Sequence, residues 1–245
     1  MPPVSIYAVD DDPLMNEIIT VLLRGEGYHV RTFERGWEAV DALRAVPPRL
    51  LILDVKMPDG NGLDVLAALR AERLLRLTRV LMLSGEDDPG VAAATRRGGA
   101  SGYLVKPFGA RQLIEEIEML LDIVKDEAPA AAAAAQASSV RDINPVVAGL
   151  VQTYGEASVG RLLRTLADEL VRLEDEVAPV PAQIEETAHA IKGAAGTLGF
   201  TMVSNACSAL EEACRKGEKV DAQLRAAMQA CAHARREIVD CLQAA

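Results

Sequence analysis

Aromatic residues are scarce in this chain of 245 residues, and cysteines are few. Phe, Trp and Tyr make up 3% of the chain, although half of its residues are hydrophobic. Ala, Leu and Val must therefore fill its cores. The four cysteines are Cys207, Cys214, Cys231 and Cys241. They lack the short paired spacings of a zinc site, so we expect free thiols in a reducing compartment.

Positive charge and long apolar runs are also lacking. Residues 1–124 carry 14 basic and 19 acidic side chains, and residues 125–245 carry 12 and 17, for a net charge of −10. An acidic surface in both halves disfavours nucleic-acid binding. No apolar run reaches the roughly 18 residues of a membrane span, and the first residues do not form a signal-peptide pattern. We therefore expect a cytoplasmic protein that binds neither nucleic acid nor membrane.

Short apolar runs alternate with amphipathic stretches in the first half of the chain. Strands are predicted at residues 4–9, 28–33, 49–55, 79–84 and 101–105. Because helical patterns lie between these runs, we predict an α/β, doubly wound, five-stranded parallel sheet over residues 1–124.

The pattern changes after residue 124. Residues 125–142 are rich in Ala, Pro and Ser and predict a linker. From 143 to 245 strand patterns disappear, and helical periodicity predicts an all-α antiparallel bundle. Its main helices are predicted at residues 159–177, 182–199, 202–217 and 222–243, with a short one near 145–153.

Polar residues follow four of the five predicted strands. Asp10, Asp11 and Asp12 follow the first, Asp54 ends the third, Ser84 ends the fourth and Lys106 follows the fifth. The carboxyl ends of parallel strands form the ligand site of such a sheet. Clustered carboxylates need a cation, and oxygen ligands suit Mg²⁺. A hydroxyl and a lysine suit a phosphoryl group.

Each of these residues alone has a structural explanation. Asp12 before Pro13 can cap a helix, and a lysine before a proline is usually a surface charge. Their coincidence at four strand ends favours a shared site. Because no glycine-rich phosphate cradle is present, we expect the phosphoryl group to be attached to protein rather than to a nucleotide.

Four motifs in the first half resemble the receiver domain of bacterial response regulators, which has the CheY-like fold. They are VDD at 9–11, LDVKMPDGNG at 53–62, LSG at 83–85 and YLVKPF at 103–108. The resemblance implies that Asp54 is the phospho-accepting nucleophile. It also implies that Ser84 and Lys106 bind the phosphoryl oxygens and that Ser84 and Tyr103 form a switch, with Tyr103 changing rotamer.

The same resemblance implies a set of Mg²⁺ ligands. Asp11 would bind the metal directly and Asp10 through water, with Asp54 and the Lys56 carbonyl completing the set. Because Asp12 adds a third acid where the family pattern needs two, an assignment shifted by one residue stays open. The peptide before Pro107 would be cis.

His189 opens the stretch HAIKGAAGTLGF at residues 189–200. On a helical wheel the apolar residues of this region point away from His189, whereas Lys192, Gly193 and Gly196 lie near it. The pattern predicts a solvent-facing imidazole on a surface that the glycines leave bare. A neutral imidazole is a competent nucleophile at neutral pH, and Lys192 can neutralise a phosphoryl group on it. A buried core histidine and a chance surface histidine are the alternatives.

This motif, together with the helix count, resembles the histidine phosphotransfer (HPt) domain over residues 145–243. The resemblance implies that His189 accepts and donates phosphoryl groups and that Lys192 assists. A chain with both acceptors is interpreted as a two-component phosphorelay protein, a transfer intermediate rather than a turnover enzyme. No kinase ATP-binding domain is present, so we expect a sensor histidine kinase and a downstream receiver or HPt protein as partners.

Two other functions remain as alternatives. The helical half could be a binding module that docks on a kinase or receiver under control of Asp54 phosphorylation, without transfer through His189. A DNA-binding regulator is disfavoured by the acidic bundle. Direct exchange between Asp54 and His189 within one chain stays open.

Overall fold

The computed structural model describes residues 4–57, 60–72, 77–85, 89–122, 143–175 and 181–243. These residues fall into two compact units, residues 4–122 and residues 143–243. The predicted linker at 125–142 lies outside the described residues. No described helix combines the length and the hydropathy that crossing a membrane requires.

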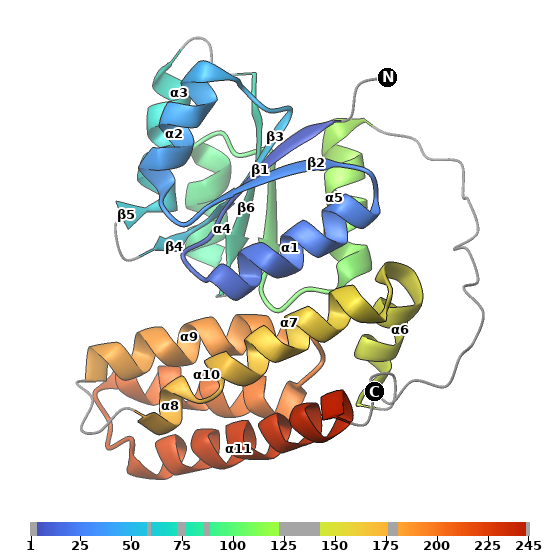
Figure 1. The fold of residues 1–245 in the computed structure, drawn as a ribbon. Coiled ribbons are helices and arrows are strands. Elements are labelled where there is room, and N and C mark those ends of the chain that lie inside the picture. The colour runs from blue at the N-terminus through green and yellow to red at the C-terminus, as the bar shows by residue number, and fades with distance from the viewer. Residues whose placement is uncertain are drawn as a thin grey trace. The chain divides into compact units, whose positions relative to one another are not determined.

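The first unit is built on a five-stranded parallel sheet, which confirms the predicted fold class (Figure 1). The strands are β1 (Ser5–Val9), β2 (His29–Phe33), β3 (Leu50–Asp54), β6 (Arg79–Ser84) and β7 (Gly102–Val105). Their order is β2-β1-β3-β6-β7. The chain first moves outward to β2 and then crosses back past β1 to β3. The topological switch point, where such sheets bind ligands, therefore lies between β1 and β3.

Helices cover both faces of this sheet. α1 (Pro13–Gly25) and α5 (Ala110–Leu121) lie on one face, and α2 (Gly36–Ala45), α3 (Gly62–Ala71) and α4 (Pro89–Arg97) lie on the other (Figure 1). A short antiparallel hairpin follows β3 and was not predicted. It consists of β4 (Lys56–Met57) and β5 (Gly60–Asn61).

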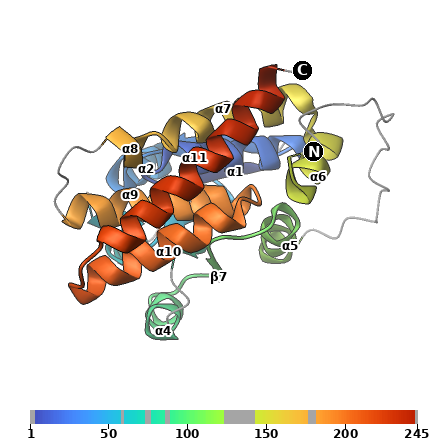
Figure 2. The same ribbon diagram turned by 90° about the horizontal axis from the view of Figure 1, so that it is seen from below.

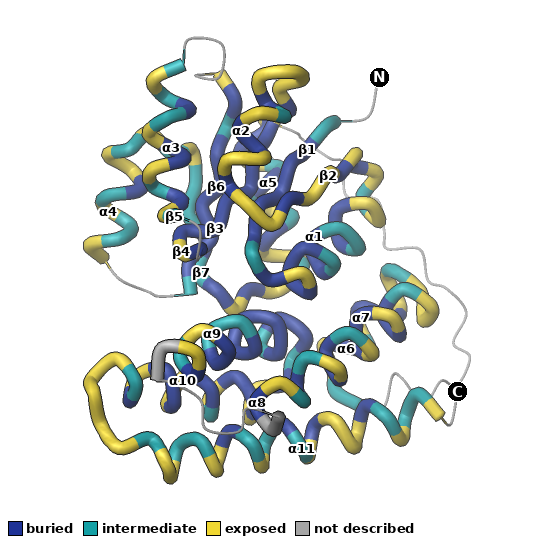
Figure 3. Tube along the Cα trace, turned by 60° about the vertical axis from the view of Figure 1, so that its left-hand side comes forward, coloured by how far each residue is buried: buried dark blue, intermediate teal, exposed yellow. Residues whose placement is uncertain are grey.

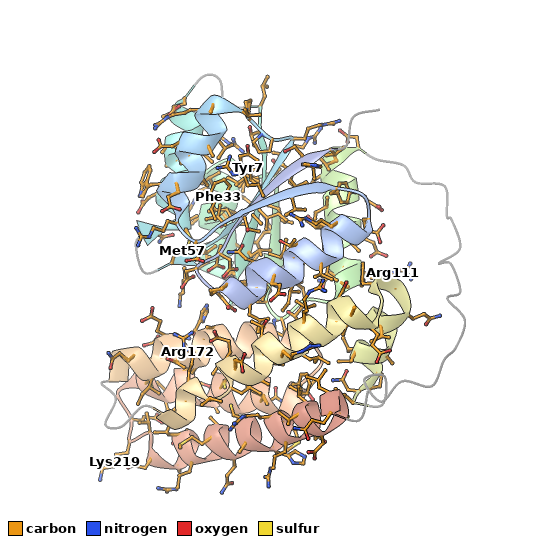
Figure 4. All side chains as sticks on the ribbon, in the orientation of Figure 1. Tyr7, Phe33, Met57, Arg111, Arg172 and Lys219 are labelled. Atoms are coloured by element: carbon orange, nitrogen blue, oxygen red, sulfur yellow. The ribbon has the colours of Figure 1, made fainter. Side chains whose placement is uncertain are left out.

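Burial on both faces explains why the central strands are continuous apolar runs. Leu50, Leu51 and Ile52 of β3 are all 0% exposed, and β1, β3 and β6 are largely dark blue in Figure 3. Aromatic residues contribute only a small part of this core. Tyr7 and Phe33 pack with their ring centroids 5.2 Å apart (Figure 4). Aliphatic side chains fill most of the rest of this core.

The second unit is all-α, as predicted. Its elements are α6 (Pro145–Tyr154), α7 (Glu156–Glu169), α8 (Arg172–Asp175), α9 (Pro181–Thr197), α10 (Thr201–Lys216) and α11 (Asp221–Gln243). α9 packs along α10, α10 along α11, and α11 against α7 (Figure 2). The predicted single helix at 159–177 is wrong, because the chain turns after α7. Leu170 and Leu173 are both buried, so the turn keeps both leucines in the core. The four cysteines are free thiols.

Gly199 ends α9 and directs the chain into α10. Its φ of +85° is left-handed, and the Phe200 N–H donates to the Ala195 carbonyl at 2.8 Å, which is a common helix-ending arrangement. A Cβ at this position would lie 2.8 Å from the Cβ of Val146. Both the backbone angle and the packing of α6 therefore require glycine here.

Candidate functional site

The first candidate site lies at the carboxyl ends of four strands. Asp10 follows β1, Asp54 ends β3, Ser84 ends β6 and Lys106 follows β7. All four side chains are buried, with exposed fractions of 1% for both aspartates, 3% for Ser84 and 7% for Lys106. Such burial of charged groups requires that they pair with one another.

Lys106 provides that pairing. Its Nζ donates to Asp10 Oδ2 at 2.6 Å and lies 3.1 Å from Asp54 Oδ1. Burial by itself lowers the pKa of this lysine, but the attraction of the two carboxylates outweighs burial and holds the pKa above its ordinary value. The ammonium therefore stays charged at neutral pH. The peptide between Lys106 and Pro107 is cis, as predicted.

The negative charge of the acidic cluster exceeds the positive charge of Lys106. Asp10, Asp11 and Asp54 each offer a carboxylate oxygen, and these atoms lie within 4.8 Å of one another. One ammonium against three carboxylates leaves two negative charges in a confined space. A divalent cation would balance them, and an all-oxygen donor set suits Mg²⁺.

Asp12, the third acid of the run, has a different setting. Its Oδ1 accepts the N–H of Leu14 at 2.9 Å, so it caps the first turn of α1, which begins at Pro13. The cluster within 4.8 Å contains Asp10 and Asp11 but not Asp12. This geometry favours the unshifted choice of Asp10 and Asp11 as ligands.

Asn16 of α1 braces the same strand end, although the sequence analysis did not select it. Its Nδ2 donates to the carbonyl of Asp10 at 2.7 Å and to that of Phe33 at 3.1 Å. The side chain is 6% exposed. It therefore fixes the end of β1 against the end of β2. The only sequence signal was a polar residue on the buried face of an amphipathic helix.

Gly62 allows α3 to begin beside Asp54. A Cβ on Gly62 would overlap the main-chain oxygen of Asp54 and lie 3.2 Å from Val55 Cα. The second glycine of the LDVKMPDGNG motif is therefore needed for close backbone approach.

The other two residues predicted for this site are Lys56 and Tyr103. Lys56 begins β4, two residues after Asp54, with an exposed side chain. Tyr103 lies on β7, half-buried, and packs against the core beneath α2 and α3.

The second candidate site is on α9. The predicted apolar stripe is buried and consists of Ile184, Ala188, Ile191, Ala195 and Leu198. His189 lies off this stripe, but its side chain is only 18% exposed. Lys192 and Gly193 are buried rather than solvent-facing, and Gly196 is half-buried. The sequence therefore predicted a more exposed surface than the structure shows. The reason is that α10 packs along α9 and supplies a carboxylate that pairs with His189 and Lys192.

That carboxylate belongs to Glu211 of α10. Its Oε1 lies 2.9 Å from His189 Nδ1, and its Oε2 accepts a hydrogen bond from Lys192 Nζ at 2.7 Å. Glu211 is 1% exposed. Burial alone would raise its pKa, but the hydrogen bonds and charges of His189 and Lys192 outweigh burial and lower the pKa to about 2.

The sequence analysis missed Glu211. On α10 the glutamate lies one turn after Cys207 and next to Leu210, both of which are 0% exposed. An acidic residue on the apolar stripe of a helix was the available signal, since an unpaired carboxylate is almost never buried.

The pairing with Glu211 sets the tautomer of His189. An ionised carboxylate only accepts hydrogen bonds, so Nδ1 must carry the proton. In the neutral ring the lone pair then lies on Nε2. Nε2 makes no hydrogen bond within the described part of the chain. This nitrogen is itself buried, and its lone pair meets no hydrogen-bond donor among the described residues.

Comparison with known proteins agrees with both halves of the fold. Residues 6–118 match the family model of the response regulator receiver domain, and residues 157–245 match that of the Hpt domain. The chain is 34% identical over 122 residues to the DNA-binding response regulator MtrA of Mycolicibacterium smegmatis, covering 50% of this chain and 52% of MtrA. It is 32% identical over 116 residues to the cell cycle transcriptional regulator CtrA of Caulobacter vibrioides, covering 47% of this chain and 49% of CtrA. The chain thus spans about half the length of the curated relatives it matches.

Solved structures give matches of similar extent. A response regulator from Chloroflexus aurantiacus is 32% identical, with a TM-score of 0.48, and the match covers 49% of this chain and 98% of that one. The chemotaxis protein CheY4 of Vibrio cholerae is 30% identical, with a TM-score of 0.47, and the match covers 49% of this chain and 99% of CheY4.

The two matched domains are of the kinds found in two-component phosphorelay signalling. The first unit carries a response regulator receiver domain over residues 6–118, and the second carries an Hpt domain over residues 157–245. Domains of these two kinds work with histidine kinases and with other receivers as phosphorelay partners.

Proposed function

We propose that this protein is an intermediate of a multistep phosphorelay, in which Asp54 and His189 each carry a phosphoryl group in turn. The observation that carries the proposal is the contact of 2.9 Å between His189 Nδ1 and Glu211 Oε1. This contact holds the proton on Nδ1 and leaves Nε2 as the nucleophilic atom. The domains proposed are a receiver at 1–124, a linker at 125–142 and a histidine phosphotransfer bundle at 143–245.

The receiver step is assigned to Asp54. A carboxylate oxygen of Asp54 attacks the phosphorus of a phosphohistidine on a partner. The P–N bond breaks, the imidazole of the partner is released, and Asp54 becomes an acyl phosphate. Mg²⁺ bound by Asp10, Asp11, Asp54 and the Lys56 carbonyl would neutralise charge on the transferring group.

The remaining receiver residues bind the product. Lys106 Nζ already lies 3.1 Å from Asp54 Oδ1, so it is placed to contact an oxygen of the new phosphoryl group. Ser84 ends the neighbouring strand and supplies a hydroxyl donor. Tyr103, on the strand that leads to Lys106, is the residue proposed to change rotamer when these contacts form.

The bundle step is assigned to His189. Its Nε2 attacks the phosphorus of an aspartyl phosphate, the P–O bond to the carboxylate breaks and a phosphoramidate forms. The Nδ1 proton stays on the ring, where the charge of Glu211 stabilises it. Lys192 adds positive charge beside the ring and so favours the negatively charged product.

The partners proposed are a sensor histidine kinase as donor and a further receiver or HPt protein as acceptor. We propose a cytoplasmic location and no binding to nucleic acid or membrane. The name of MtrA describes that protein as DNA-binding, whereas the second half of this chain matches the Hpt domain, and both halves carry more acidic than basic residues.

Phosphotransfer from a radiolabelled phospho-kinase and from a radiolabelled phospho-receiver tests the proposal. Wild-type protein should acquire alkali-labile label, as in an acyl phosphate, and label that is acid-labile but alkali-stable, as in a phosphohistidine. Asp54→Asn should lose the first and His189→Gln the second, whereas His233→Gln, at an exposed histidine of α11, should keep both. Label confined to an acyl phosphate in wild-type protein would favour the binding-module alternative instead.

A further inference from the structure

Arg215 is a third basic partner of the Glu211 carboxylate. Its Nη2 donates to Glu211 Oε1 at 2.7 Å. The same oxygen faces His189 Nδ1 at 2.9 Å, while Lys192 occupies the other oxygen, Oε2, at 2.7 Å. The imidazole and the guanidinium therefore share one carboxylate oxygen.

Arg215 also connects the two helices of the site. It lies one turn after Glu211 on α10, and its Nε is 3.7 Å from Oε1 of Glu185. Glu185 lies one turn before His189 on α9. The guanidinium thus bridges a carboxylate on each helix, and Glu211 lies between it and the imidazole ring.

We propose that Arg215 is a positioning residue, which fixes the rotation of the Glu211 carboxylate and thereby holds His189 in the tautomer with a free Nε2. This inference rests on the proposed function of His189 in phosphotransfer. Arg215 acts from the Nδ1 side of the ring, behind Glu211, so it has no contact with the reacting nitrogen.

Lys192 alone would not hold the carboxylate in this way. The terminal torsion of glutamate is broad, and an ammonium is a point charge on a flexible stem that can follow either oxygen. A guanidinium has a planar fork of donors in fixed directions. With Arg215 on Oε1 and Lys192 on Oε2, each oxygen has its own cation, and the lone pair of Oε1 stays directed at Nδ1.

The test compares Arg215→Met with Arg215→Lys in the full chain. The proportion of His189 that carries its proton on Nδ1 is read from ring ¹⁵N shifts, with His189→Gln used to assign the signals. We expect Arg215→Met to shift the population away from the Nδ1–H form and to slow phosphoryl acceptance about tenfold, the scale of one lost charge-assisted hydrogen bond. Arg215→Lys keeps the charge but not the planar fork, so it should restore only part of both.

Lys216→Met is the matched control. Lys216 follows Arg215 and makes an exposed ion pair with Glu212 at 2.6 Å, away from His189. Lys216→Met should leave both the proportion of His189 with its proton on Nδ1 and the rate of phosphoryl acceptance unchanged. A wild-type tautomer population in Arg215→Met would overturn the inference, as would a slower rate that accompanies only a lower melting temperature. If His189→Gln transfers phosphoryl groups normally, the proposed function fails, whereas the tautomer measurement still decides the role of Arg215.

Discussion

The two charged clusters of this protein are opposite in composition. In the receiver, one lysine pairs with two of three clustered carboxylates. In the bundle, one carboxylate is shared by a lysine, an arginine and an imidazole. The first cluster has an excess of negative charge, so a cation can bind there. The second already contains two cations, Lys192 and Arg215, against the carboxylates of Glu211 and Glu185. We therefore propose that it can hold a phosphoryl group without a metal.

The largest expected effect follows from replacing the bundle carboxylate. Glu211→Gln removes the charge that holds the Nδ1 proton, and its amide can present a donor to Nδ1 instead. We expect phosphotransfer through His189 to fall about a hundredfold, the effect of losing the tautomer together with the charge that stabilises it. Rates of label transfer from a phospho-receiver measure this.

Glu212→Gln, on the exposed neighbour of Glu211, is the control and should transfer at the wild-type rate. An equal loss in both variants would contradict the role given to Glu211 and would remove the contrast between the two clusters.

Acid titration tests the same carboxylate through stability. The pKa of Glu211 is lowered from 4.5 to about 2 in the folded protein, so the folded state favours its ionised form. The resulting stabilisation, about 3 kcal/mol, is present above about pH 4.5 and is lost as pH falls toward 2. The stability of Glu211→Gln should not fall in this way between pH 4.5 and 2, because the variant has no carboxylate at this position.

Urea unfolding of the bundle, followed by helical circular dichroism, measures this dependence. Trp37, the single tryptophan, lies on α2 of the receiver. Its fluorescence follows the receiver alone and separates the two transitions. Parallel pH profiles for wild type and Glu211→Gln would show that the carboxylate is not held in its ionised form by the fold.

Metal affinity tests the receiver side. Asp11→Asn should weaken Mg²⁺ binding about tenfold or more, because it removes one of three clustered carboxylates. Asp12→Asn is the matched control, since asparagine caps a helix as well as aspartate does. It should leave Mg²⁺ affinity close to wild type. Calorimetric titration with Mg²⁺ measures both, and the reverse result would shift the ligand assignment by one residue.

Asn16→Ala should have the smallest effect. It leaves the carbonyls of Asp10 and Phe33 without their side-chain donor, which costs about 1 kcal/mol of receiver stability, the net scale of a hydrogen bond. Unfolding followed by Trp37 fluorescence measures this. The bundle transition should not move, and an unchanged receiver transition would show that Asn16 does not brace the strand ends.

The contrast also explains what the sequence could reveal. The receiver site was predictable because parallel strands bring their carboxyl ends together, so the placement of Asp54, Ser84 and Lys106 follows from topology alone. The face of α9 was only partly predictable. A helical wheel places His189 off the apolar stripe, but it does not say which residue of another helix packs against it.

Glu211 and Arg215 were missed for that reason. They lie on α10, and their pairing with His189 depends on how α9 and α10 pack along each other. The hairpin of β4 and β5 was missed because two-residue strands carry no hydrophobic period. The interruption between α7 and α8 was missed because the apolar pattern continues across it.

³¹P nuclear magnetic resonance of the phosphorylated full chain gives the most direct test of the central claim, because it distinguishes a phosphoramidate on Nε2 from one on Nδ1. With Glu211 holding the Nδ1 proton, we predict an Nε2 phosphoramidate on His189, which is absent from His189→Gln. A signal from the Nδ1 isomer, or no phosphoramidate when a competent phospho-receiver is supplied, would contradict the account.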